Sequence, residues 1–528
     1  MRTINNPPNP KRAIIGFRDT GYNLYTAVAD LVDNSINARA DNVVVKLWQD
    51  EAGKTHARII DDGYGMDEDE LIDAMKYGAS EKEVGNELGK FGLGLKTAST
   101  SVCKNLIVLT RKDPDGPIFQ ASWDLDMIGG NKYDYPLEIG EAVAPFAKEF
   151  EDSVSGTGTI VCWEKIDRLG GETSTEGTNI TTQVLGQYKK RLIEHLRMVF
   201  HKFIEAKKIK IFYGEEELIP WNPFAPGEKT LTPISHKFEI EENKISGKVS
   251  GVLKLDAHII PSKYEYSTDE ARENWLPRRG QNKLQGFYVY REDRLIVAHD
   301  WLGLFNKEVH YSLARVEMNF SSDLDEFFDL DIKKSNFNIE KLYTALESLL
   351  TPYREQANQR HRTARIRAGG EQKKDPHGPS QELIKSKYDS STSEVKVKKV
   401  GKNKVEVENK AGKTLIRIPT LDPDFSDQLI KVEESVEDGL FWSPCLLENK
   451  IGVLINRSHP YYERVYEPNY DDSVTVRGLD SILWALAKCE QEVMNEETRR
   501  RLKDFRRMIS GTLRELAEEL PEMQESAD

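Results

Sequence analysis

The chain has 528 residues, carries a formal net charge of −14 at pH 7 and contains 38% hydrophobic residues. This length predicts about three domains with cores of their own, and the acidic balance excludes a basic coat over the whole chain, so contact with nucleic acid would depend on local patches. The four cysteines are far apart, which argues against a zinc site or a disulfide framework.

The N-terminal end lacks the apolar segment typical of a signal peptide, and no apolar run approaches the ~18 residues that a membrane-spanning helix needs. We therefore expect a cytoplasmic protein. Residues 1–20 are predicted to form an extended arm, which is rich in proline at its start.

Residues 21–180 mix helical and strand patterns. Apolar residues at helical spacing predict a helix over 22–38, and a β-branched run predicts a strand over 42–48. A second strand, over 57–60, ends at Asp61. Further along we expect a helix over 67–75, a glycine-rich and charged loop over 77–91, a helix over 93–101, and strands over 106–110, 118–123 and 159–163. This mixture predicts an α+β sandwich with helices on one face of a mixed sheet.

The rest of the chain divides by composition. Residues 181–352 combine a long helix over 185–206 with several strands, including 287–290 and 295–298, and predict a second α/β domain. Residues 353–420 are polar and basic, with β-hairpin patterns toward their end, and predict a linker. Residues 421–528 predict a C-terminal domain that ends in helices.

The first motif, Asp30-Leu-Val-Asp-Asn34, lies on the helix over 22–38. Asp30 and Asn34 are four residues apart, so they share one helix face. An amide oxygen at Asn34 can ligate Mg²⁺, and a carboxylate one turn earlier can orient a water molecule on a terminal phosphate. Alternatively, this face is only solvated.

The second motif is Asp61-Asp-Gly-Tyr-Gly65-Met66. Its aspartate ends a strand, and Gly63 and Gly65 let the backbone approach a flat ligand. An aspartate in this position can accept a hydrogen bond from the exocyclic amine of adenine, which favours ATP over GTP.

The third motif is Gly89-Lys-Phe-Gly-Leu-Gly94-Leu-Lys96, which leads into a helix. Exposed amides of a glycine-rich loop and a helix N-terminus attract phosphate oxygens, and the two lysines can add charge. The candidate nucleotide contacts here are Lys90, Phe91, Gly92, Leu93, Gly94 and Lys96. The loop over 77–91 is placed to close over a nucleotide.

In this order, the three motifs resemble the GHKL ATPases, which include gyrase, the heat-shock chaperone, histidine kinases and MutL. Two segments are similar to MORC proteins in residue identity as well as in glycine spacing, namely DDGYGMDEDELIDAMKYGAS and KFGLGLKTAS. The resemblance implies a Bergerat ATP-binding sandwich over about residues 15–175, then a ribosomal-protein-S5-like transducer domain, with ATP and Mg²⁺ as cofactors.

The same resemblance suggests further site residues. The family's Gly-Thr element matches Ser155-Gly-Thr-Gly-Thr159, so either Thr157 or Thr159 reaches the adenine-side aspartate, and we favour Thr159 because its strand continues directly. A transducer lysine contacts the γ-phosphate in this family. Lys334 is our first choice for that role and Lys333 the second.

One position departs from the family, which has glutamate where this chain has Asp30. Aspartate is one methylene shorter, so its reach to a water molecule differs, and we expect slow hydrolysis or a site that has adjusted its position.

The resemblance implies an ATP-driven switch in which two protomers meet through their N-terminal domains. Its output would be a clamp on DNA. A role in genome or phage defence, and a protein partner from that pathway, are suggested by analogy. Candidate DNA contacts are Arg360, Arg362, Arg365, Arg367, Lys373, Lys374, Lys396, Lys398, Lys399, Lys402 and Lys404. The alternative is an ATP-dependent chaperone or a scaffold without DNA binding. A histidine kinase is disfavoured because Asp30 lies too close to the start of the chain.

Overall fold

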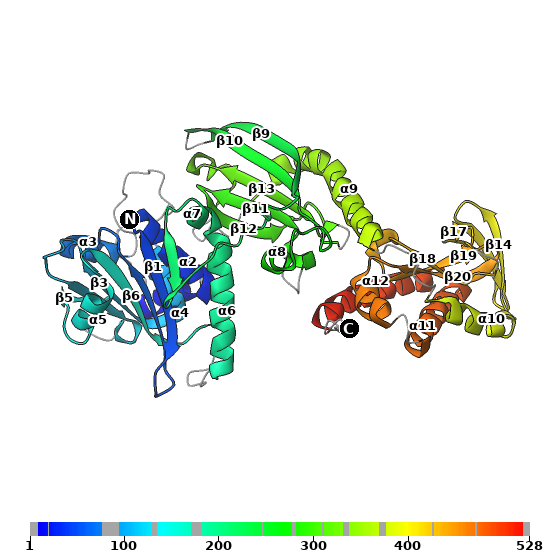
Figure 1. Cartoon of the computed structure of the whole chain (residues 1–528), viewed down its shortest axis with the longest axis horizontal. Coiled ribbons are helices and arrows are strands. Elements are labelled where there is room, and N and C mark those ends of the chain that lie inside the picture. Colours follow the sequence, from blue (N-terminus) through cyan, green and yellow to red (C-terminus); the bar gives the residue numbers. More distant parts are fainter. Residues whose placement is uncertain are drawn as a thin grey trace, which may run out of the picture. The chain divides into compact units, whose positions relative to one another are not determined.

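The structure is a computed structural model, in which the chain divides into two compact units (Figure 1). The first unit comprises Met1–His258, Gly286–Leu304 and Arg315–Glu347, and the second comprises Ile259–Gln285, Phe305–Ala314 and Ser348–Asp528. The structure describes residues 9–19, 21–76, 94–128, 135–169, 181–244, 247–276, 281–308, 311–330, 337–368, 376–424, 427–469 and 473–520.

An eight-stranded sheet with strand order β5-β4-β3-β6-β2-β1-β7-β8 forms the N-terminal part of the first unit. All neighbouring strands are antiparallel except β1 and β7. The strands are β1 (Asn42–Gln49), β2 (Thr55–Asp61), β3 (Cys103–Arg111), β4 (Phe119–Asp124), β5 (Glu138–Glu141), β6 (Gly158–Ile166), β7 (Lys210–Tyr213) and β8 (Glu216–Glu217). In β2, the successive residues Ile59 and Ile60 point to opposite faces and are both buried, which indicates that this strand is covered on both sides.

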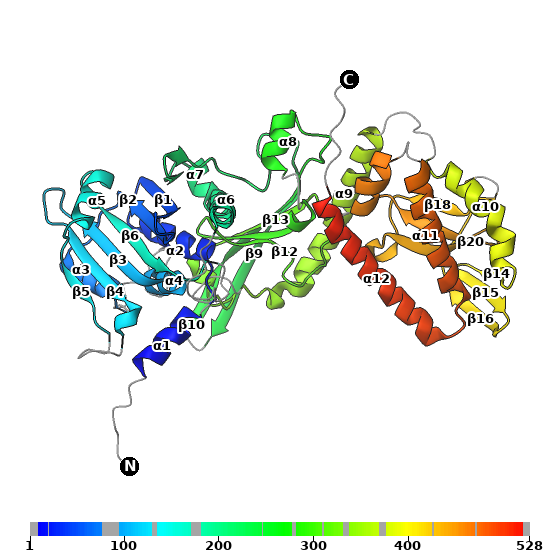
Figure 2. The same ribbon diagram turned by 90° about the horizontal axis from the view of Figure 1, so that it is seen from below.

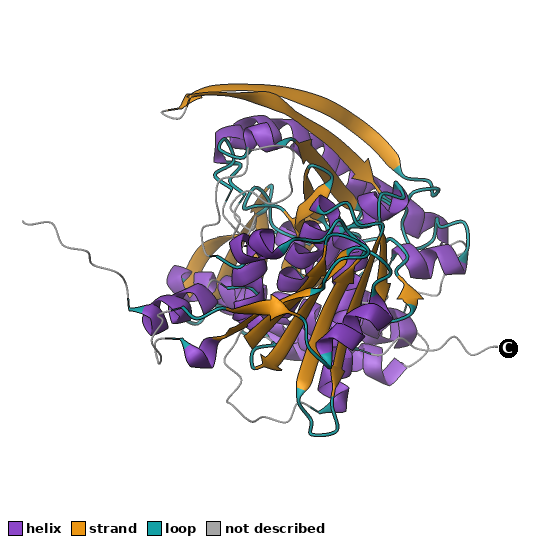
Figure 3. Cartoon of the chain, turned by 90° about the vertical axis from the view of Figure 1, so that its left-hand side faces the viewer, coloured by secondary structure: helices purple, strands orange, loops and turns teal. Residues whose placement is uncertain are grey.

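Helices pack against this sheet (Figure 3). On one face, α2 (Leu24–Asn37), α4 (Gly94–Val102) and α6 (Thr182–Val199) contribute to one hydrophobic core. On the other face, α5 (Phe146–Ser153) contributes Phe150 to a smaller core. The expected mixed α/β architecture is therefore present, although helices cover both faces of the sheet rather than one. A short helix, α3 (Glu68–Ala74), follows the turn after β2.

The start of the chain differs from the extended arm that its prolines suggested, because residues 10–18 form a helix, α1 (Pro10–Arg18). The side chain of Asn9 accepts a hydrogen bond from the backbone N–H of Arg12 at 3.1 Å and so caps this helix. Pro10 occupies the first turn, where a missing N–H costs nothing. Ile14 is buried, so tertiary packing holds the helix in place.

A second sheet of the first unit has strand order β12-β11-β13-β10-β9. Its strands are β9 (Leu231–Lys244), β10 (Gly247–Ile259), β11 (Gly286–Arg291), β12 (Arg294–Asp300) and β13 (Ala314–Phe320). The turn expected at Glu292 and Asp293 joins β11 to β12, and both residues have positive φ. α6 lies between the two sheets (Figure 2) and contacts both α2 and β12.

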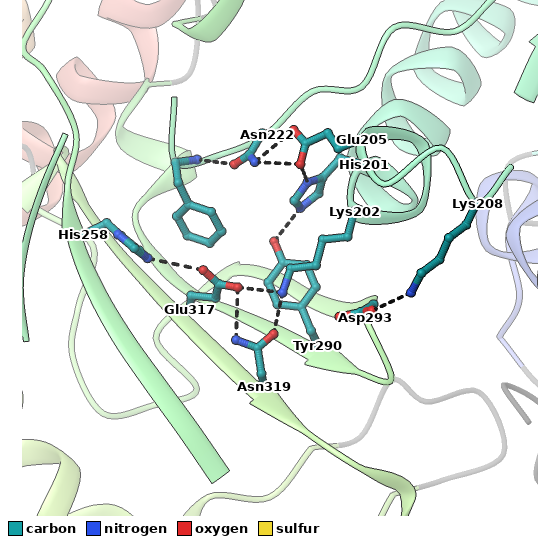
Figure 4. A network of polar contacts seen from close by, with 11 residues as sticks. His201, Lys202, Glu205, Lys208, Asn222, His258, Tyr290, Asp293, Glu317 and Asn319 are labelled. Atoms are coloured by element: carbon teal, nitrogen blue, oxygen red, sulfur yellow. Dashed lines mark hydrogen bonds and ion pairs between the residues drawn. The ribbon is translucent and has the colours of Figure 1, made fainter. Parts of the chain in front are cut away.

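A polar network joins α7 (His201–Glu205) to the second sheet (Figure 4). The ammonium of Lys202 lies 2.6 Å from a carboxylate oxygen of Glu317 on β13 and 3.7 Å from the ring centre of Tyr290 on β11. The hydroxyl of Tyr290 lies 2.8 Å from the ring nitrogen Nε2 of His201. Burial favours a high pKa at Glu317, but His258, Lys202 and Asn319 lower it to about 2. The network therefore keeps a buried ion pair charged and ties α7, which directly follows α6, to the second sheet.

The second unit contains two further sheets and several helices. β14 (Lys396–Gly401), β15 (Lys404–Asn409) and β16 (Gly412–Arg417) form an antiparallel three-stranded sheet. The four-stranded sheet has the order β17-β19-β20-β18, with strands β17 (Thr420–Leu421), β18 (Ile430–Glu433), β19 (Trp442–Leu447) and β20 (Lys450–Asn456). The helices are α8 (Asp269–Trp275), α10 (Gly378–Thr392), α11 (Ser473–Glu492) and α12 (Glu496–Glu519).

Two helices correct the linker that composition predicted over residues 353–420. α9 (Tyr343–Ala368) runs through Pro352, and α10 follows it. The side chains of Leu346, Leu350, Tyr353 and Ala357 are all buried, and their spacing of three to four residues defines one packed helix face. Tertiary packing thus overrides the polar composition and the internal proline. Within the described residues, no helix combines the length and apolarity that a membrane crossing requires.

Candidate functional site

The carboxylate of Asp30 is buried on α2, with 7% of the residue exposed. The hydroxyl of Tyr22 donates to its Oδ2 at 2.6 Å, and Nη2 of Arg294 lies 3.5 Å from its Oδ1. Asn34, one turn further along α2, is exposed. A Cβ added to Gly94, the first residue of α4, would lie 4.0 Å from Oδ2 of Asp30. The predicted acid therefore lies beside the start of α4, and the predicted metal ligand is accessible to solvent.

Arg294, on β12, is a residue of this site that sequence reasoning did not identify. Its Nε donates to both carboxylate oxygens of Asp33 at 3.1 Å, so one guanidinium contacts two acids of the same helix. Burial favours a lower pKa at Arg294, but Asp33 and Asp30 raise it, so the guanidinium stays charged. No local pattern in the sequence indicates this contact, because Arg294 and Asp33 are far apart along the chain.

Asp61 ends β2 and is also buried. Ser35 donates to its Oδ2 at 2.9 Å, and the backbone N–H of Gly63 donates to its Oδ1 at 3.0 Å. Burial raises the pKa of Asp61 to about 6, although these two donors act in the opposite direction. This carboxylate is therefore mostly ionised at pH 7 and can accept another hydrogen bond. Sequence reasoning missed Ser35, and the signal that could have identified it is its position directly after Asn34, on the buried side of α2.

The two glycines after Asp61 have a packing role within the protein, and their approach to a flat ligand stays a prediction. A Cβ on Gly65, which has φ of +64°, would lie 2.0 Å from the carbonyl oxygen of Arg111. A Cβ on Gly63 would lie 2.8 Å from both the Cβ and the carbonyl oxygen of Ala38. Both glycines therefore allow the turn to pack against β3 and against the end of α2, so the close backbone approach lies within the protein.

Three threonines surround this turn. Thr159 on β6 is the register partner of Asp61, and its hydroxyl lies 3.2 Å from that of Thr110 on β3. The Thr110 oxygen also accepts from the backbone N–H of Met66 at 2.9 Å. Thr157 instead donates to the carbonyl of Gly63 at 2.8 Å. The roles of Thr159 and Met66 in nucleotide binding stay predictions, and Thr110, which was not predicted, fastens the turn to the sheet.

Several predicted nucleotide contacts are not brought together by the described part of the chain. The ammonium of Lys96 is buried and donates to the carbonyl of Ala74 at 2.9 Å, and burial lowers its pKa to about 8. The predictions at Lys90, Phe91, Gly92, Leu93, Lys333 and Lys334, and for the loop over 77–91, lie outside the described residues.

The predicted DNA contacts differ among themselves. Arg360 on α9 already binds Glu265 at 2.9 Å and the carbonyl of Ile259 at 2.8 Å. Lys396 and Lys398 are exposed on β14, opposite two glutamates of β15, while Lys399 is exposed on the same strand. Lys402 and Lys404 are exposed next to it. Lys373, Lys374 and the side chains of Arg362, Arg365 and Arg367 lie outside the described part of the structure.

Asp30, Asn34 and Asp61 all fall within one stretch of the chain that matches a known family. Residues 22–157 match the family described as histidine kinase-, DNA gyrase B-, and HSP90-like ATPase. Their match covers β1–β4 and most of the site described above.

Relatives of this chain are MORC proteins. ATPase MORC2B of Mus musculus is 31% identical over 94 residues, which are 17% of this chain and 9% of the relative. ATPase morc-1 of Caenorhabditis elegans is 25% identical over 230 residues, 37% of this chain and 27% of the relative. ATPase MORC2 of Homo sapiens is 32% identical over 94 residues, 17% of this chain and 9% of the relative. The resemblance to GHKL ATPases of the MORC type is therefore confirmed, while the chain spans only 9% to 27% of the length of these relatives.

Proposed function

We propose that the chain binds ATP with Mg²⁺ and hydrolyses it at a site formed by α2, the turn after β2 and the start of α4. The observation that carries this proposal is the junction between α2 and β2. Ser35 donates to Asp61 and directly follows Asn34 in the sequence. The buried carboxylate proposed for adenine is thus bonded to the residue next to the exposed amide proposed for the metal.

The donor groups fit an adenine nucleotide and a magnesium ion. Asn34 offers an exposed amide oxygen, which is a hard ligand of the kind that Mg²⁺ prefers. Asp61 retains lone pairs beyond those used by Ser35 and Gly63, so it can accept from the adenine amine. The positive end of the α4 dipole at Gly94 attracts anionic oxygens.

In the proposed chemistry, Asp30 accepts the proton of the attacking water. ATP supplies a terminal phosphoryl group that water can attack, and the barrier is lowered mainly by positioning and charge stabilisation. Asp30 orients the water and accepts its proton while the bond between the γ-phosphorus and ADP breaks and ADP leaves. Asn34 would hold the metal, and Lys334, which lies outside the described residues, is the residue proposed to contact the γ-phosphate. Tyr22 and Arg294 hold the Asp30 carboxylate beside the start of α4.

Single-turnover phosphate release, measured beside equilibrium ATP binding, tests this division of roles. Asp30→Asn should lower the hydrolysis rate by about 100-fold or more while ATP affinity changes by less than about threefold. Asp61→Asn should weaken ATP binding instead. Asp62→Asn is the matched control, because Asp62 binds Asn42 at 2.6 Å rather than facing the proposed site. Equal rates in the native chain and Asp30→Asn would remove Asp30 from the mechanism.

We further propose that ATP drives dimerisation through the N-terminal domains and closes a clamp on DNA. The exposed lysines 396, 398 and 399 support a sequence-independent phosphate contact. Gel shifts with linear and circular DNA, with and without a non-hydrolysable ATP analogue, should show binding that depends on nucleotide and weakens with salt. Binding that ignores both variables contradicts the clamp, and protection of an unfolded client protein without any DNA effect favours the chaperone alternative.

A further inference from the structure

One guanidinium from the second sheet reaches two carboxylates of the nucleotide-binding domain. Arg294 begins β12, and only 8% of it is exposed. Its Nε lies 3.1 Å from both oxygens of Asp33, and its Nη2 lies 3.5 Å from Oδ1 of Asp30. The two acids are three residues apart on α2, so they lie on neighbouring positions of the same helix face.

The Asp30 carboxylate is held from a second direction by Tyr22. The phenol hydroxyl donates to Oδ2 at 2.6 Å, and Tyr22 itself is 5% exposed. Tyr22 precedes α2 in the chain, whereas Arg294 belongs to the second sheet. Each oxygen of Asp30 is therefore contacted by a side chain from a different element, and together these contacts limit rotation of the carboxylate.

The electrostatic balance of this cluster favours a cation at position 294. Two buried carboxylates one turn apart repel each other, and a buried charge without a partner is strongly destabilising. Arg294 supplies the positive charge and, with its planar fork of donors, fixes the direction of the contact as well. The guanidinium carbon of Arg294 also lies over the ring of Phe200, 5.6 Å from the ring centre.

The position of the second sheet relative to α2 is itself fixed by packing. α6 contacts both α2 and β12, and α7, which directly follows α6, is tied to β11 and β13 by the network of Lys202, Glu317 and Tyr290 (Figure 4). A displacement of β12 would therefore move Arg294 relative to Asp30. It would leave Ser35, Gly63 and their contacts with Asp61 in place, because these contacts involve only α2 and the turn after β2.

We propose that Arg294 is a positioning residue, which makes the orientation of the Asp30 carboxylate depend on the position of the second sheet. Tyr22 has the corresponding role at the other oxygen of this carboxylate. This proposal rests on the function proposed above, in which Asp30 accepts the proton of the attacking water. It predicts that the contact affects the chemical step and leaves nucleotide affinity nearly unchanged.

A paired substitution tests this proposal without changing the net charge of the buried cluster. Arg294→Met combined with Asp33→Asn removes one positive and one negative charge. We expect kcat to fall by about tenfold or more, with the Kd for ATP within about threefold of the native value, because a misdirected catalytic group costs rate rather than binding. The single variant Arg294→Lys, which retains Asp33, should recover part of the lost kcat.

The same hairpin provides the matched control. Arg291 on β11 binds Asp325 through two buried hydrogen bonds of 2.7 and 2.9 Å, and it is the register partner of Arg294. Arg291→Met combined with Asp325→Asn removes an equivalent buried pair whose hydrogen bonds to each other involve no residue of α2, so kcat should stay within about twofold of the native value. Equal losses in both double variants would overturn the proposal, because they would show a general effect on folding.

Tyr22→Phe provides an independent arm, since it removes one hydroxyl and keeps the ring. A fall in kcat at constant Kd supports positioning, whereas a rise would overturn the proposal by showing that the hydrogen bond restrains Asp30. Asp30→Asn, measured in parallel, separates the two levels of inference. If Asp30→Asn hydrolyses ATP like the native chain, the proposed function fails. If Asp30→Asn is inactive while the Arg294 double variant is fully active, only the positioning role fails.

Discussion

Replacing Gly65 by alanine tests the close packing of the turn after β2 against β3. Gly65 has φ of +64°, and Gly214, in the turn between β7 and β8, has φ of +63°. An alanine at either position adopts a left-handed conformation at a cost of about 1–2 kcal/mol, partly offset by a less flexible unfolded chain. The two glycines therefore share the same backbone penalty and differ in their surroundings.

The surroundings add a second penalty only at Gly65. Its added Cβ would lie 2.0 Å from the carbonyl oxygen and 2.6 Å from the carbonyl carbon of Arg111, whereas a Cβ at Gly214 meets no atom within 4 Å. Arg111 is paired with Gly158 of β6, so relief of the overlap must separate the turn from the sheet. We expect an additional cost of about 3 kcal/mol, at the upper end for overpacking, because backbone atoms cannot rotate away.

Differential scanning calorimetry of the full chain measures this difference. For a domain of this size, each kcal/mol lowers the Tm by about 2–4 °C, so Gly65→Ala should melt about 6–12 °C below Gly214→Ala. The transition of the first unit is identified as the one that Gly214→Ala shifts. If the two variants melt within about 2 °C of each other, the predicted overlap with Arg111 does not exist, and the argument for this turn is refuted.

Three further predictions concern the site itself. ATP affinity should fall by up to about tenfold between pH 7 and pH 5 relative to Asp61→Asn, which corrects for titration of the nucleotide. The pKa of Asp61 is raised to about 6, and its protonated carboxyl is a weaker acceptor for the adenine amine than the carboxylate; equal profiles would contradict this. The same raised pKa means that the stability contributed by Asp61 is present below its ordinary pKa of 3.8 and lost as the pH rises through about 6. Thr110→Val should lower the free energy of unfolding by about 1–2 kcal/mol in urea denaturation, since the backbone N–H of Met66 loses its acceptor, and an unchanged midpoint would contradict that role. Asp30→Glu should lower single-turnover kcat rather than raise it, because a buried carboxylate already 2.6 Å from Tyr22 has no room for another methylene; a faster rate would show instead that the shorter aspartate limits hydrolysis.

The local elements of the first unit could be predicted because each has a strong periodic pattern. The helix expected over 22–38 is α2, and the strands expected over 42–48 and 57–60 are β1 and β2. These patterns placed Asp30, Asn34 and Asp61 on the correct elements before any tertiary structure was considered. Asn23, whose capping box starts α2, acts within one helical turn, which is why sequence alone can reveal such a boundary.

The partners of those residues could not be predicted, because they come from distant parts of the chain. Thr110 reaches Met66 across the sheet, and Arg294 reaches Asp33 from another sheet altogether. Nothing in the hydrophobic period of β12 indicates a guanidinium aimed at α2. The part of the long helix α9 that follows residue 352 was also missed, because composition predicted a linker there and the buried residues Tyr353 and Ala357 make only a narrow apolar face among polar neighbours.

The contact of Arg294 with α2 bears on how this protein can be cut for study. A fragment that stops at residue 157, where the likeness to the ATPase family ends, retains Asp30 and Asp33 but has lost the cation between them. Such a fragment also lacks α6, which packs against α2, so apolar residues of α2 become exposed to water and we expect it to be poorly soluble. A fragment that extends through Glu347 keeps the guanidinium and both sheets, and is the shorter piece that preserves the charge balance of the intact first unit.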